Sequence, residues 1–509
     1  MRWLRQLSLM GTVALWMLIE NPSQFSERLS TWLRVNHPSQ FSKLVSTACN
    51  STHRHRSGIE QLIYEGEFSA AVARYQQNPS RARRDISKVK TAAGEISRLR
   101  TPIARSPEVQ NRRTNARPLF YLTNSLPHTV SGYTLRSQAS LEALRDQGIK
   151  VNAITRLGYP NVIGKFATSE DEEVGEINYH RQMPLTMPRT LHNRDEKAVS
   201  LLVKQSERWG ATLLHTTSDY RNALVAGQAA KELGVPWVYE VRGEPHKTWL
   251  SKRIAESQSR AARSEFFRLA SRKEIEAMNA ASAVVVLSEI SRQRIREAGI
   301  PDEKIYVVPN AVDETLFYKT FNKQSLRREL GIPNGKVVGI ISSLVDYEGV
   351  DTLLESIHID STLNAIIVGE GEARPHLESV CRELSIEDRV QFVGKKPPSE
   401  IWKWYASLDV MAIPRRDEEV CRTVTPIKGL AAQALGVPVV ASDLPALREI
   451  TGGHAVYFQP ESAEGLVDGI GKALLQDSKQ LEQARGWARS HTWHENAKKY
   501  VQIYDAILG

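Results

Sequence analysis

Residues 425–450 read TPIKGLAAQALGVPVVASDLPALREI, which has the pattern of a helix followed by a buried strand. Thr425 is a favourable N-cap, Pro426 fits the first helical position, and Gly436 suits a left-handed stop. We therefore predict a helix over 426–435. The apolar run VPVVAS that follows is typical of a strand buried on both faces of a parallel sheet.

The start of this helix predicts an anion-binding site. A helix N-terminus has free N–H groups and the positive end of the helix dipole, and Lys428 in the first turn adds a cation. The alternative is that Lys428 is a solvated residue of an ordinary surface helix.

Strands and helices alternate in two blocks along the chain. Apolar runs such as PLFYLT at 118–123 and VVGIISSL at 337–344 are separated by helical segments. This order predicts the α/β fold class, with two Rossmann-like doubly wound domains. Ligands of such sheets bind outside the carboxyl ends of the strands, so a cleft between the two domains is the expected site. We place the first domain, the second domain and a C-terminal helix at residues 117–313, 314–490 and 491–509.

The first 116 residues are predicted to be a helical extension with a basic linker. Two similar segments begin at Asn21 and His37, and IEQLIYEGEFSAAVARYQQNP at 59–79 resembles half of a tetratricopeptide hairpin around Gly66. The apolar run at 7–19 follows two arginines but is shorter than the roughly 18 to 20 residues needed to span a bilayer. A surface-lying or buried helix is the first interpretation, a weak signal anchor the second and cleaved secretion the third.

The positive charge of the chain is concentrated in this extension. The net charge is +9, and residues 1–118 hold 19 Lys and Arg against 8 Asp and Glu. Such a segment favours contact with an anionic membrane surface, or it is a solvated linker. No aromatic residues are interleaved with the basic runs and no nucleic-acid motif is present, so we expect no nucleic-acid partner.

Composition and motifs exclude several classes of protein. The hydrophobic content of 41% and charged content of 25% are ordinary for a soluble globular protein. Cys49, Cys381 and Cys421 are scattered without metal-ligand spacing, which predicts no metal site and a reducing, cytoplasmic compartment. The first strand is not followed by G-x-G-x-x-G, and H-E-x-x-H and G-x-S-x-G are absent, so dinucleotide, zinc-protease and α/β-hydrolase chemistry are disfavoured.

From about Arg117 to Gly509 the chain resembles the retaining GT-B glycosyltransferases of family four, also called glycosyl transferases group 1. The resemblance rests on several long motifs in the family's order, and the closing segment WARSHTWHENAKKYVQIYDAIL resembles the family's last helix, which crosses back to the first domain. Two features, a YEVRG strand and a VTPxK helix, indicate a subgroup. The motifs are LTNSLPHTVSGYTLRSQASLEAL, VYEVRG, ASAVVVLSEISRQRIREAGIPDEKIYVVPNAVD, GIISSLVDYEGVDTLLESI, IIVGEGEARPHLE and ALGVPVVASDLPALREI.

The resemblance implies roles for residues of the first, acceptor-side domain. Gly132 and Tyr133 lie in the family's glycine loop, which contacts substrate. His215 and Arg242 take the catalytic positions, with Arg242 where many members have a histidine near the donor sugar. Arg242 could bind a phosphate or an acidic sugar bidentately, or pair structurally with Glu240 or Glu244. For His215 the alternative is a histidine satisfied within a strand-end network.

In the second, nucleotide-sugar domain the chain departs from the family's phosphate-binding pattern. The usual G-R-L and E-K-G motifs supply an Arg and a Lys, but Ser343 and Glu348 stand at those places. Substrate binding is then expected from the residues of the GEG loop, which meets the nucleoside, and from the nearby basic residues and the predicted helix cap. This set is Ser343, Gly369, Glu370, Gly371, Arg415, Arg416, Arg422, Thr425 and Lys428.

A further departure lies in the helix itself. The family has two glutamates eight positions apart, the second of which binds the donor ribose, whereas this chain has Thr423 and Ala431 there. Losing such a carboxylate typically costs about 1.5 to 3 kcal/mol per charged hydrogen bond. Donor binding is therefore expected to be weaker without catalysis being abolished.

These features together predict a retaining glycosyltransferase in cell-surface polysaccharide or glycoconjugate biosynthesis. It would transfer a sugar from a nucleotide sugar, with a UDP-sugar favoured, to a glycan or lipid-linked acceptor, and it would require no cofactor. The expected location is the cytoplasm, with peripheral contact at the inner face of the membrane. The alternative is a catalytically weak or inactive scaffold or binding protein on the same fold, and a sugar epimerase of this fold has no specific motif in its favour.

Overall fold

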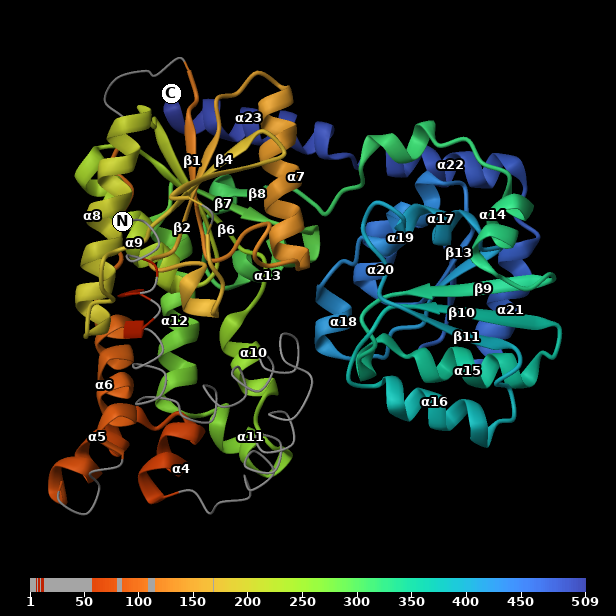
Figure 1. The fold of residues 1–509 in the computed structure, drawn as a ribbon, viewed down its shortest axis with the longest axis horizontal. Coiled ribbons are helices and arrows are strands. Elements are labelled where there is room, and N and C mark those ends of the chain that lie inside the picture. The colour runs from red at the N-terminus through yellow and green to blue at the C-terminus, as the bar shows by residue number, and fades with distance from the viewer. Residues whose placement is uncertain are drawn as a thin grey trace. The chain divides into compact units, whose positions relative to one another are not determined.

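The computed structural model describes residues 6, 8, 9, 11, 12, 57–79, 85–108, 115–167 and 169–509. The repeat predicted at 21–51 and most of the apolar run at 7–19 lie outside the described residues. The described chain forms two compact units. The first contains the described residues up to Val285 together with Ala298–Tyr306 and Val501–Gly509, and the second contains Val286–Glu297 and Val307–Tyr500. Figure 1 shows the elements of each unit.

The first unit is built on an eight-stranded sheet with the order β3-β4-β2-β1-β5-β6-β7-β8. The pairings from β4 to β7 are parallel, and β3 pairs antiparallel with β4. The chain therefore has the predicted doubly wound character, with one antiparallel edge strand added. The strands are β1 Pro118–Leu122, β2 Asn152–Thr155, β3 Asp171–Val174, β4 Ile177–Arg181, β5 Leu213–Thr217, β6 Trp237–Glu240, β7 Ala283–Val286 and β8 Ile305–Val307.

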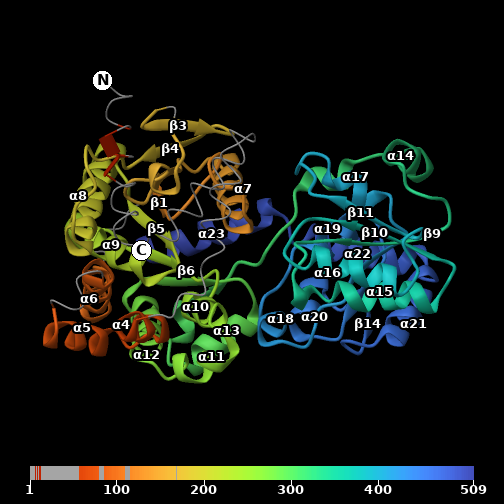
Figure 2. The same ribbon diagram turned by 60° about the horizontal axis from the view of Figure 1, so that its bottom comes forward.

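Helices flank this sheet (Figures 1 and 2). Helix α7 begins at Gly132 because Ser131 and Thr134 form a capping box, so the predicted glycine loop opens directly into a helix. Helix α9 begins after the N-cap Asp219, whose side chain accepts a hydrogen bond from the N–H of Arg221. The helices of this unit after the extension are α7 Gly132–Asp146, α8 Leu191–Trp209, α9 Tyr220–Leu233, α10 Pro245–Ser251, α11 Ala255–Ala261 and α12 Glu265–Ala280.

The N-terminal extension contains three described helices, α4 Gly58–Glu65, α5 Phe68–Gln77 and α6 Ile86–Arg100. Ser57 and Glu60 form a capping box at the start of α4, and Gly66 ends it in the left-handed region with φ 87°. The prediction of helices on both sides of Gly66 is confirmed. Residues 6, 8, 9, 11 and 12 are helical as well, and Leu9 is fully buried against Ala167 and Met183.

The second unit is built on a six-stranded, fully parallel sheet with the order β11-β10-β9-β12-β13-β14. One apolar core lies on each face of the sheet, one including α15, α16 and α21 and the other including α17, α19, α20 and α22. The strands are β9 Lys336–Ile341, β10 Leu363–Val368, β11 Val390–Gly394, β12 Val410–Ile413, β13 Val439–Ser442 and β14 Val456–Phe458. The helices are α13 Glu289–Glu297, α14 Lys323–Leu330, α15 Val350–Ile359, α16 Arg374–Glu383, α17 Ile401–Ala406, α18 Glu419–Thr423, α19 Lys428–Ala434, α20 Pro445–Thr451, α21 Ala463–Leu474 and α22 Ser478–Arg489, while α23 Trp493–Leu508 ends in the first unit.

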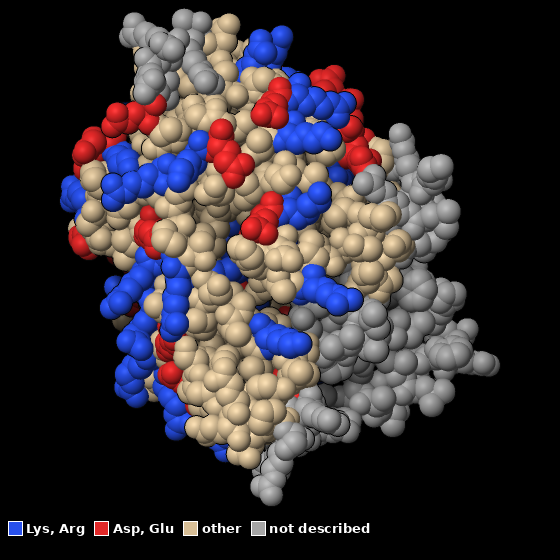
Figure 3. All heavy atoms as spheres, turned by 90° about the vertical axis from the view of Figure 1, so that its left-hand side faces the viewer, with Lys and Arg blue, Asp and Glu red and all other residues tan. Residues whose placement is uncertain are grey.

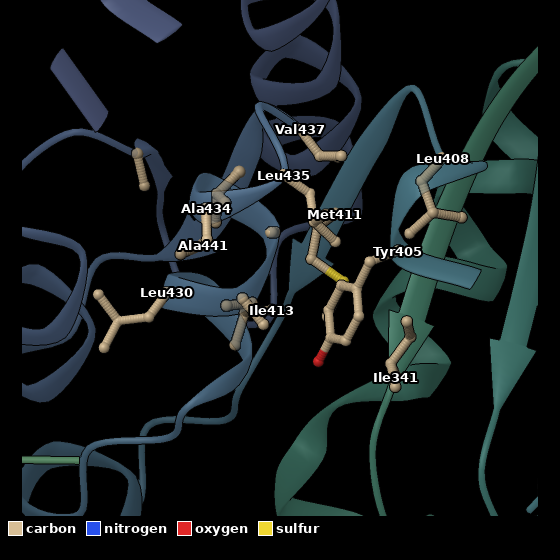
Figure 4. Packing of buried hydrophobic residues seen from close by; sticks show 14 of the residues in the cluster. Ile341, Tyr405, Leu408, Met411, Ile413, Leu430, Ala434, Leu435, Val437 and Ala441 are labelled. Carbon is tan, nitrogen blue, oxygen red and sulfur yellow. The ribbon is translucent and has the colours of Figure 1, made fainter. Parts of the chain in front are cut away.

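Buried side chains of β12 and α19 interlock in one of these cores (Figure 4). Leu408, which is fully buried, lies over Gly339 of β9, where an added Cβ would come within 2.4 Å of its side chain. A glycine at 339 is therefore needed for this close packing. Ala431 is 8% exposed and belongs to the same core.

The stretch at 425–450 forms the predicted strand, but its helix begins later than predicted. Strand β13 and the left-handed stop at Gly436, with φ 71°, are confirmed. The prediction that Pro426 starts the helix was wrong, because α19 begins at Lys428 and Thr425 makes no side-chain cap. The carbonyl of Thr425, which an N-cap would give to the helix, instead accepts a hydrogen bond of 2.8 Å from the side chain of Asn310.

Candidate active site

Three loops meet at the carboxyl edge of the second unit's sheet, where β9, β10 and β12 end. An added Cβ at Gly349 would lie 1.9 Å from the carbonyl oxygen of Pro414, and one at Gly369 would lie 1.7 Å from that of Ser342. Both glycines also have positive φ, at 65° and 146°. The glycines therefore allow the loops to pack backbone against backbone, at the edge where parallel sheets bind ligands.

A buried ionic cluster, which we call the Glu348 cluster, joins these loops. The carboxylate of Glu348 lies 2.9 Å from Nη2 of Arg415 and 2.7 Å from Nζ of Lys428. The side chains of Glu348 and Arg415 are each 7% exposed and that of Lys428 is 19% exposed. With two cations around one carboxylate, the cluster carries a net charge of +1.

The environment shifts the pKa values of this cluster. Burial raises the pKa of Glu348, but Lys428 and Arg415 outweigh it, so the net pKa lies below the ordinary value. Burial, together with the charge of Arg415, lowers the pKa of Lys428 to about 8, although Glu348 opposes the shift. The charge of Lys428 therefore responds to pH in the mildly alkaline range.

Thr425 adds an unused hydroxyl beside this cluster. The residue is 3% exposed, and its Oγ1 has no hydrogen-bond partner among the described residues. The carbonyl of the preceding residue, Val424, accepts a hydrogen bond of 3.0 Å from Nη1 of Arg415. Thr425 therefore follows directly on a residue that Arg415 holds, and hydroxyl, ammonium and guanidinium groups are donors that phosphate oxygens accept.

The other residues predicted for this domain lie at the same edge but in separate contacts. The backbone carbonyl of Glu370 accepts a hydrogen bond of 3.0 Å from the N–H of Leu344. This bond holds the GEG loop beside Ser343, which is exposed. Arg416 pairs with Asp351 and Arg422 pairs with Asp417. The structure therefore brings Arg415, Thr425 and Lys428 together and leaves Arg416 and Arg422 outside the Glu348 cluster.

The first unit has a second buried cluster, which we call the Glu240 cluster. Glu240 is fully buried and lies 2.8 Å from Nε of Arg136, 2.9 Å from Nη2 of Arg242 and 3.2 Å from Nε2 of His215. Burial raises the pKa of Glu240, but Arg242 and Arg136 hold it well below the ordinary value. With neutral His215, this cluster also carries a net charge of +1.

His215 lies inside this network. Its Nδ1 is 2.8 Å from the hydroxyl of Tyr504, its ring stacks on Phe120 at 4.3 Å, and it is fully buried. Burial lowers its pKa despite the nearby Glu240, so the ring is neutral at pH 7. This is the geometry of the strand-end network that the sequence left as the alternative, and a catalytic role for His215 stays a prediction.

Arg242 pairs with Glu240, one of the two partners left open by the sequence, while Glu244 pairs with Lys247 at 3.1 Å. Nη1 of Arg242 donates to the carbonyl of Tyr133 at 2.9 Å and to Oγ of Ser137 at 2.6 Å. Its Nε has no hydrogen-bond partner in the described part of the chain. One N–H of the buried guanidinium is therefore without a partner among the described residues.

The glycine loop lies next to this cluster. An added Cβ at Gly132 would meet no atom within 4 Å, so the backbone there is open to approach. Tyr133 is 57% exposed, and its hydroxyl lies 2.7 Å from where a Cβ of Gly243 would be. Arg136, one turn farther along α7, was missed in the sequence; its only signal was a cation on the buried face of a helix.

Neither unit shows a group suited to a metal ion: among the described residues, no three His, Cys, Asp or Glu side chains come together. Of the helices in the described ranges, none has the length and apolar character needed to cross a lipid bilayer.

Comparisons with known proteins place both units. Residues 131–311 match the family model described as "Glycosyl transferase 4-like domain", and residues 322–499 match "Glycosyl transferases group 1". The chain therefore contains two regions that match glycosyltransferase domain models, and one of the two candidate clusters lies in each region.

Curated relatives are glycosyltransferases too. A D-inositol 3-phosphate glycosyltransferase of Corynebacterium urealyticum is 29% identical over 201 residues, covering 36% of this chain and 46% of the relative. An uncharacterized glycosyltransferase of Methanocaldococcus jannaschii is 21% identical and covers 75% and 96%. The lipopolysaccharide core biosynthesis mannosyltransferase LpsB of Rhizobium meliloti is 28% identical, with 42% and 64% covered. The match thus spans about half of the first relative and two thirds of the third.

Solved structures share the fold. Sucrose-phosphate synthase of Thermosynechococcus elongatus has a TM-score of 0.59 at 20% identity, covering 76% of this chain and 98% of that one. Anabaena HepE in complex with UDP has a TM-score of 0.57 at 19% identity, covering 76% and 98%. The chain therefore has the predicted GT-B fold of two Rossmann-like domains.

The pairing of Arg242 predicts unequal effects for its two glutamate neighbours. Glu240→Gln leaves two buried arginines without a counter-charge, so we expect a loss of about 3 to 5 kcal/mol in the free energy of unfolding. The matched control Glu244→Gln breaks an ion pair whose side chains are 34% and 39% exposed, and should change stability by less than about 1 kcal/mol. Urea unfolding of both variants tests this, and equal effects would contradict the assignment.

Proposed function

We propose that the protein is a retaining glycosyltransferase that uses a nucleotide sugar, with a UDP-sugar favoured, and transfers the sugar to a glycan or lipid-linked acceptor. The observation that carries the proposal is the Glu348 cluster with the unused hydroxyl of Thr425, at the carboxyl edge of the group 1 domain. The UDP-bound structure of HepE, which shares the fold, supports a nucleotide donor.

In this proposal the donor diphosphate binds at the Glu348 cluster. Arg415 and Lys428 supply the positive charge. In the family that the chain resembles, this charge comes from an Arg and a Lys at the positions that Ser343 and Glu348 occupy here. Glu348 holds both cations in place before donor binds, and the net charge of +1 favours an anion. As the sugar leaves, negative charge grows on the diphosphate, and preorganised cations stabilise that charge more than they stabilise the ground state.

The first prediction concerns the donor. Incubation with a panel of UDP-, GDP- and ADP-sugars should show binding and nucleotide release for one donor. Lys428→Met should weaken UDP binding about tenfold to a hundredfold, because it removes a charged hydrogen bond worth about 1.5 to 3 kcal/mol. Calorimetric titration of UDP measures this effect.

Lys472→Met is the matched control, since Lys472 is 64% exposed on α21, where it pairs with Asp468. It should bind UDP like the wild type. Folded wild-type protein that binds no nucleotide sugar would instead favour the scaffold alternative.

The second prediction is a pH dependence. Because the pKa of Lys428 is about 8, raising the pH from 7.5 to 9.5 removes its proton, and UDP affinity should fall by about tenfold. Lys428→Met should show a flat profile over this range.

Deprotonation of Lys428 does not destabilise the fold, so the loss of UDP affinity would not be caused by unfolding that this group brings about. Its folded pKa lies below the ordinary value of 10.5, so between about 8 and 10.5 the unfolded state binds more protons, and this group's contribution to stability rises with pH. An affinity that stays constant in the wild type up to pH 9.5 would contradict a role for the Lys428 charge.

The third prediction concerns stereochemistry and metal. We propose front-face attack with retention, in which Arg415 and Lys428 do the charge stabilisation that a metal ion would do elsewhere. Proton NMR of the product should show the anomeric configuration of the donor, and excess EDTA should leave turnover within about twofold. An inverted product or loss of turnover with EDTA would contradict this part of the proposal.

The fourth prediction concerns the membrane. We propose that the basic N-terminal extension brings the protein to an anionic inner membrane face, where a lipid-linked acceptor would be found. The LpsB relative, named for lipopolysaccharide core biosynthesis, supports this kind of acceptor. On the face that Figure 3 shows, however, Lys and Arg lie among Asp and Glu, so the attraction should be weak and salt-sensitive.

Co-sedimentation with vesicles tests the membrane contact. We expect binding to anionic vesicles at low salt, its loss at about 0.5 M salt because charges are then screened, and no binding to neutral vesicles. Equal binding to both kinds of vesicle would contradict an electrostatic contact.

A further inference from the structure

Two connections leave the first unit's sheet directly beside Arg242. Residues 218 and 219 follow β5 and lead into α9, while residues 241–264 follow β6 and contain α10 and α11. The N–H of Arg242 donates to Oγ of Ser218 at 3.2 Å, and the N–H of Ser218 donates to the carbonyl of Glu240 at 2.9 Å. The position of Arg242 therefore depends on both connections.

Helix α6 of the N-terminal extension holds the first connection. The buried carboxylate of Glu95 accepts a hydrogen bond from the hydroxyl of Tyr220 and pairs with Arg221, the first two residues of α9. Arg221 pairs with Asp219 at 2.7 Å as well. Burial raises the pKa of Glu95, but the charges of Arg221 and Arg98 outweigh this effect, and the net pKa lies below the ordinary value. The carboxylate is therefore charged at pH 7.

The same helix is fixed to the domain by a second ion pair. Nε and Nη2 of Arg98 lie 2.7 Å and 2.6 Å from the two carboxylate oxygens of Asp195 on α8. An added Cβ at Gly94 would lie 3.1 Å from Leu191, so α6 and α8 approach closely. Glu95 is thus presented to the β5 connection by a helix that is itself held rigidly.

Helix α4 holds the second connection. The hydroxyl of Tyr64 accepts a hydrogen bond of 3.0 Å from the N–H of Ile254. The guanidinium of Arg253 lies between two aromatic rings, 4.5 Å from that of Tyr64 and 4.3 Å from that of Trp249. Arg260 of α11 pairs with Glu65 at 2.8 Å. Figures 1 and 2 both show α4 beside α12 and α11.

We propose that α4 and α6 form a built-in positioning element for the first domain's site. Glu95 holds the connection after β5, and Tyr64 holds the connection after β6, so that Arg242 and residues 241–264 keep the conformation needed to receive the acceptor. Glu95 and Tyr64 are positioning residues and act through Tyr220, Arg221, Arg253 and Ile254. The acceptor-binding part rests on the proposed function, whereas the positioning itself does not.

Hydrogen exchange of the full chain, followed by mass spectrometry, tests the positioning. In Glu95→Ala, peptides covering 218–222 should exchange about tenfold faster, and in Tyr64→Leu the same should hold for peptides covering 249–256. Each variant should leave the other connection, and strand β9 of the second unit, unchanged. The matched control is Lys88→Gln, which breaks a pair with Glu60 inside the extension and touches neither connection.

Conservative variants keep the test decisive if a truncation does not fold. Glu95→Gln retains an acceptor for Tyr220 but loses the charge that Arg221 needs, and Tyr64→Phe keeps the ring but loses the acceptor for Ile254. Both should give smaller increases at the same peptides. Folded variants that exchange at the wild-type rate in these connections would overturn the proposal.

Activity separates this proposal from the proposed function. With the donor that the nucleotide-sugar panel identifies, Glu95→Gln and Tyr64→Phe should lower kcat for transfer about threefold to tenfold while the Kd for UDP stays within about twofold. If wild-type protein binds no UDP, the proposed function fails and the exchange experiment still decides the positioning. A third outcome is that UDP binds but the variants show neither slower transfer nor faster exchange. In that case the positioning role is wrong while the proposed function stands.

Discussion

A buried carboxylate between two cations is the constraint on which the second domain's candidate site depends. Glu348 comes from the loop after β9, Arg415 from the end of β12 and Lys428 from the start of α19, so one carboxylate fixes three separate elements. Removing one member of a buried ion-paired group usually leaves an uncompensated charge that costs several kcal/mol. The three elements are therefore held together before any ligand arrives, and the surplus positive charge is available to an anion.

The first domain uses the same arrangement on a different set of elements. Glu240 of β6 pairs with Arg136 of α7 and with Arg242, which follows β6. It also contacts His215 of β5, which in turn contacts Tyr504 of the C-terminal helix. The charged residues are satisfied by one another, yet Nε of Arg242 and Oγ1 of Thr425 have no partner within the described residues. Each domain therefore has one buried donor without a partner, on Arg242 of the Glu240 cluster and on Thr425 next to the residue that Arg415 holds.

The sequence predicted the larger features of this fold because they depend on local pattern. The apolar runs of β1, β9, β10, β12 and β13 and the turn at Gly436 follow from hydrophobic periodicity and glycine conformation. The edge hairpin of β3 and β4 was missed because its sequence, DEEVGEINYHR, is polar and charged and has no apolar run, although Glu172, Tyr179 and Arg181 are buried in the structure. The helix start was predicted too early in the chain because the carbonyl of Thr425 accepts a hydrogen bond from the side chain of Asn310, which is 115 residues away.

The candidate sites show the same division. Arg415, Thr425 and Lys428 could be selected from sequence as a basic group near a helix start, but the pairing of two of them with Glu348, 67 or more residues earlier, is a tertiary contact. In the sequence, Glu348 stands where the family that the chain resembles has a lysine. In the structure, its carboxylate joins Arg415 and Lys428. Likewise, the N-terminal helices read as a separate extension, yet Glu95 and Tyr64 contact residues that lie 125 and 190 positions later.

A crystal structure of the full chain with UDP bound tests the central claim most directly, because it shows where the diphosphate lies. We expect phosphate oxygens within hydrogen-bond distance of Thr425 Oγ1, Lys428 Nζ and the guanidinium of Arg415, with Glu348 still beside both cations. A diphosphate bound elsewhere in the second domain, with Thr425 Oγ1 and Lys428 making no contact to it, would contradict the assignment of the Glu348 cluster as the donor site.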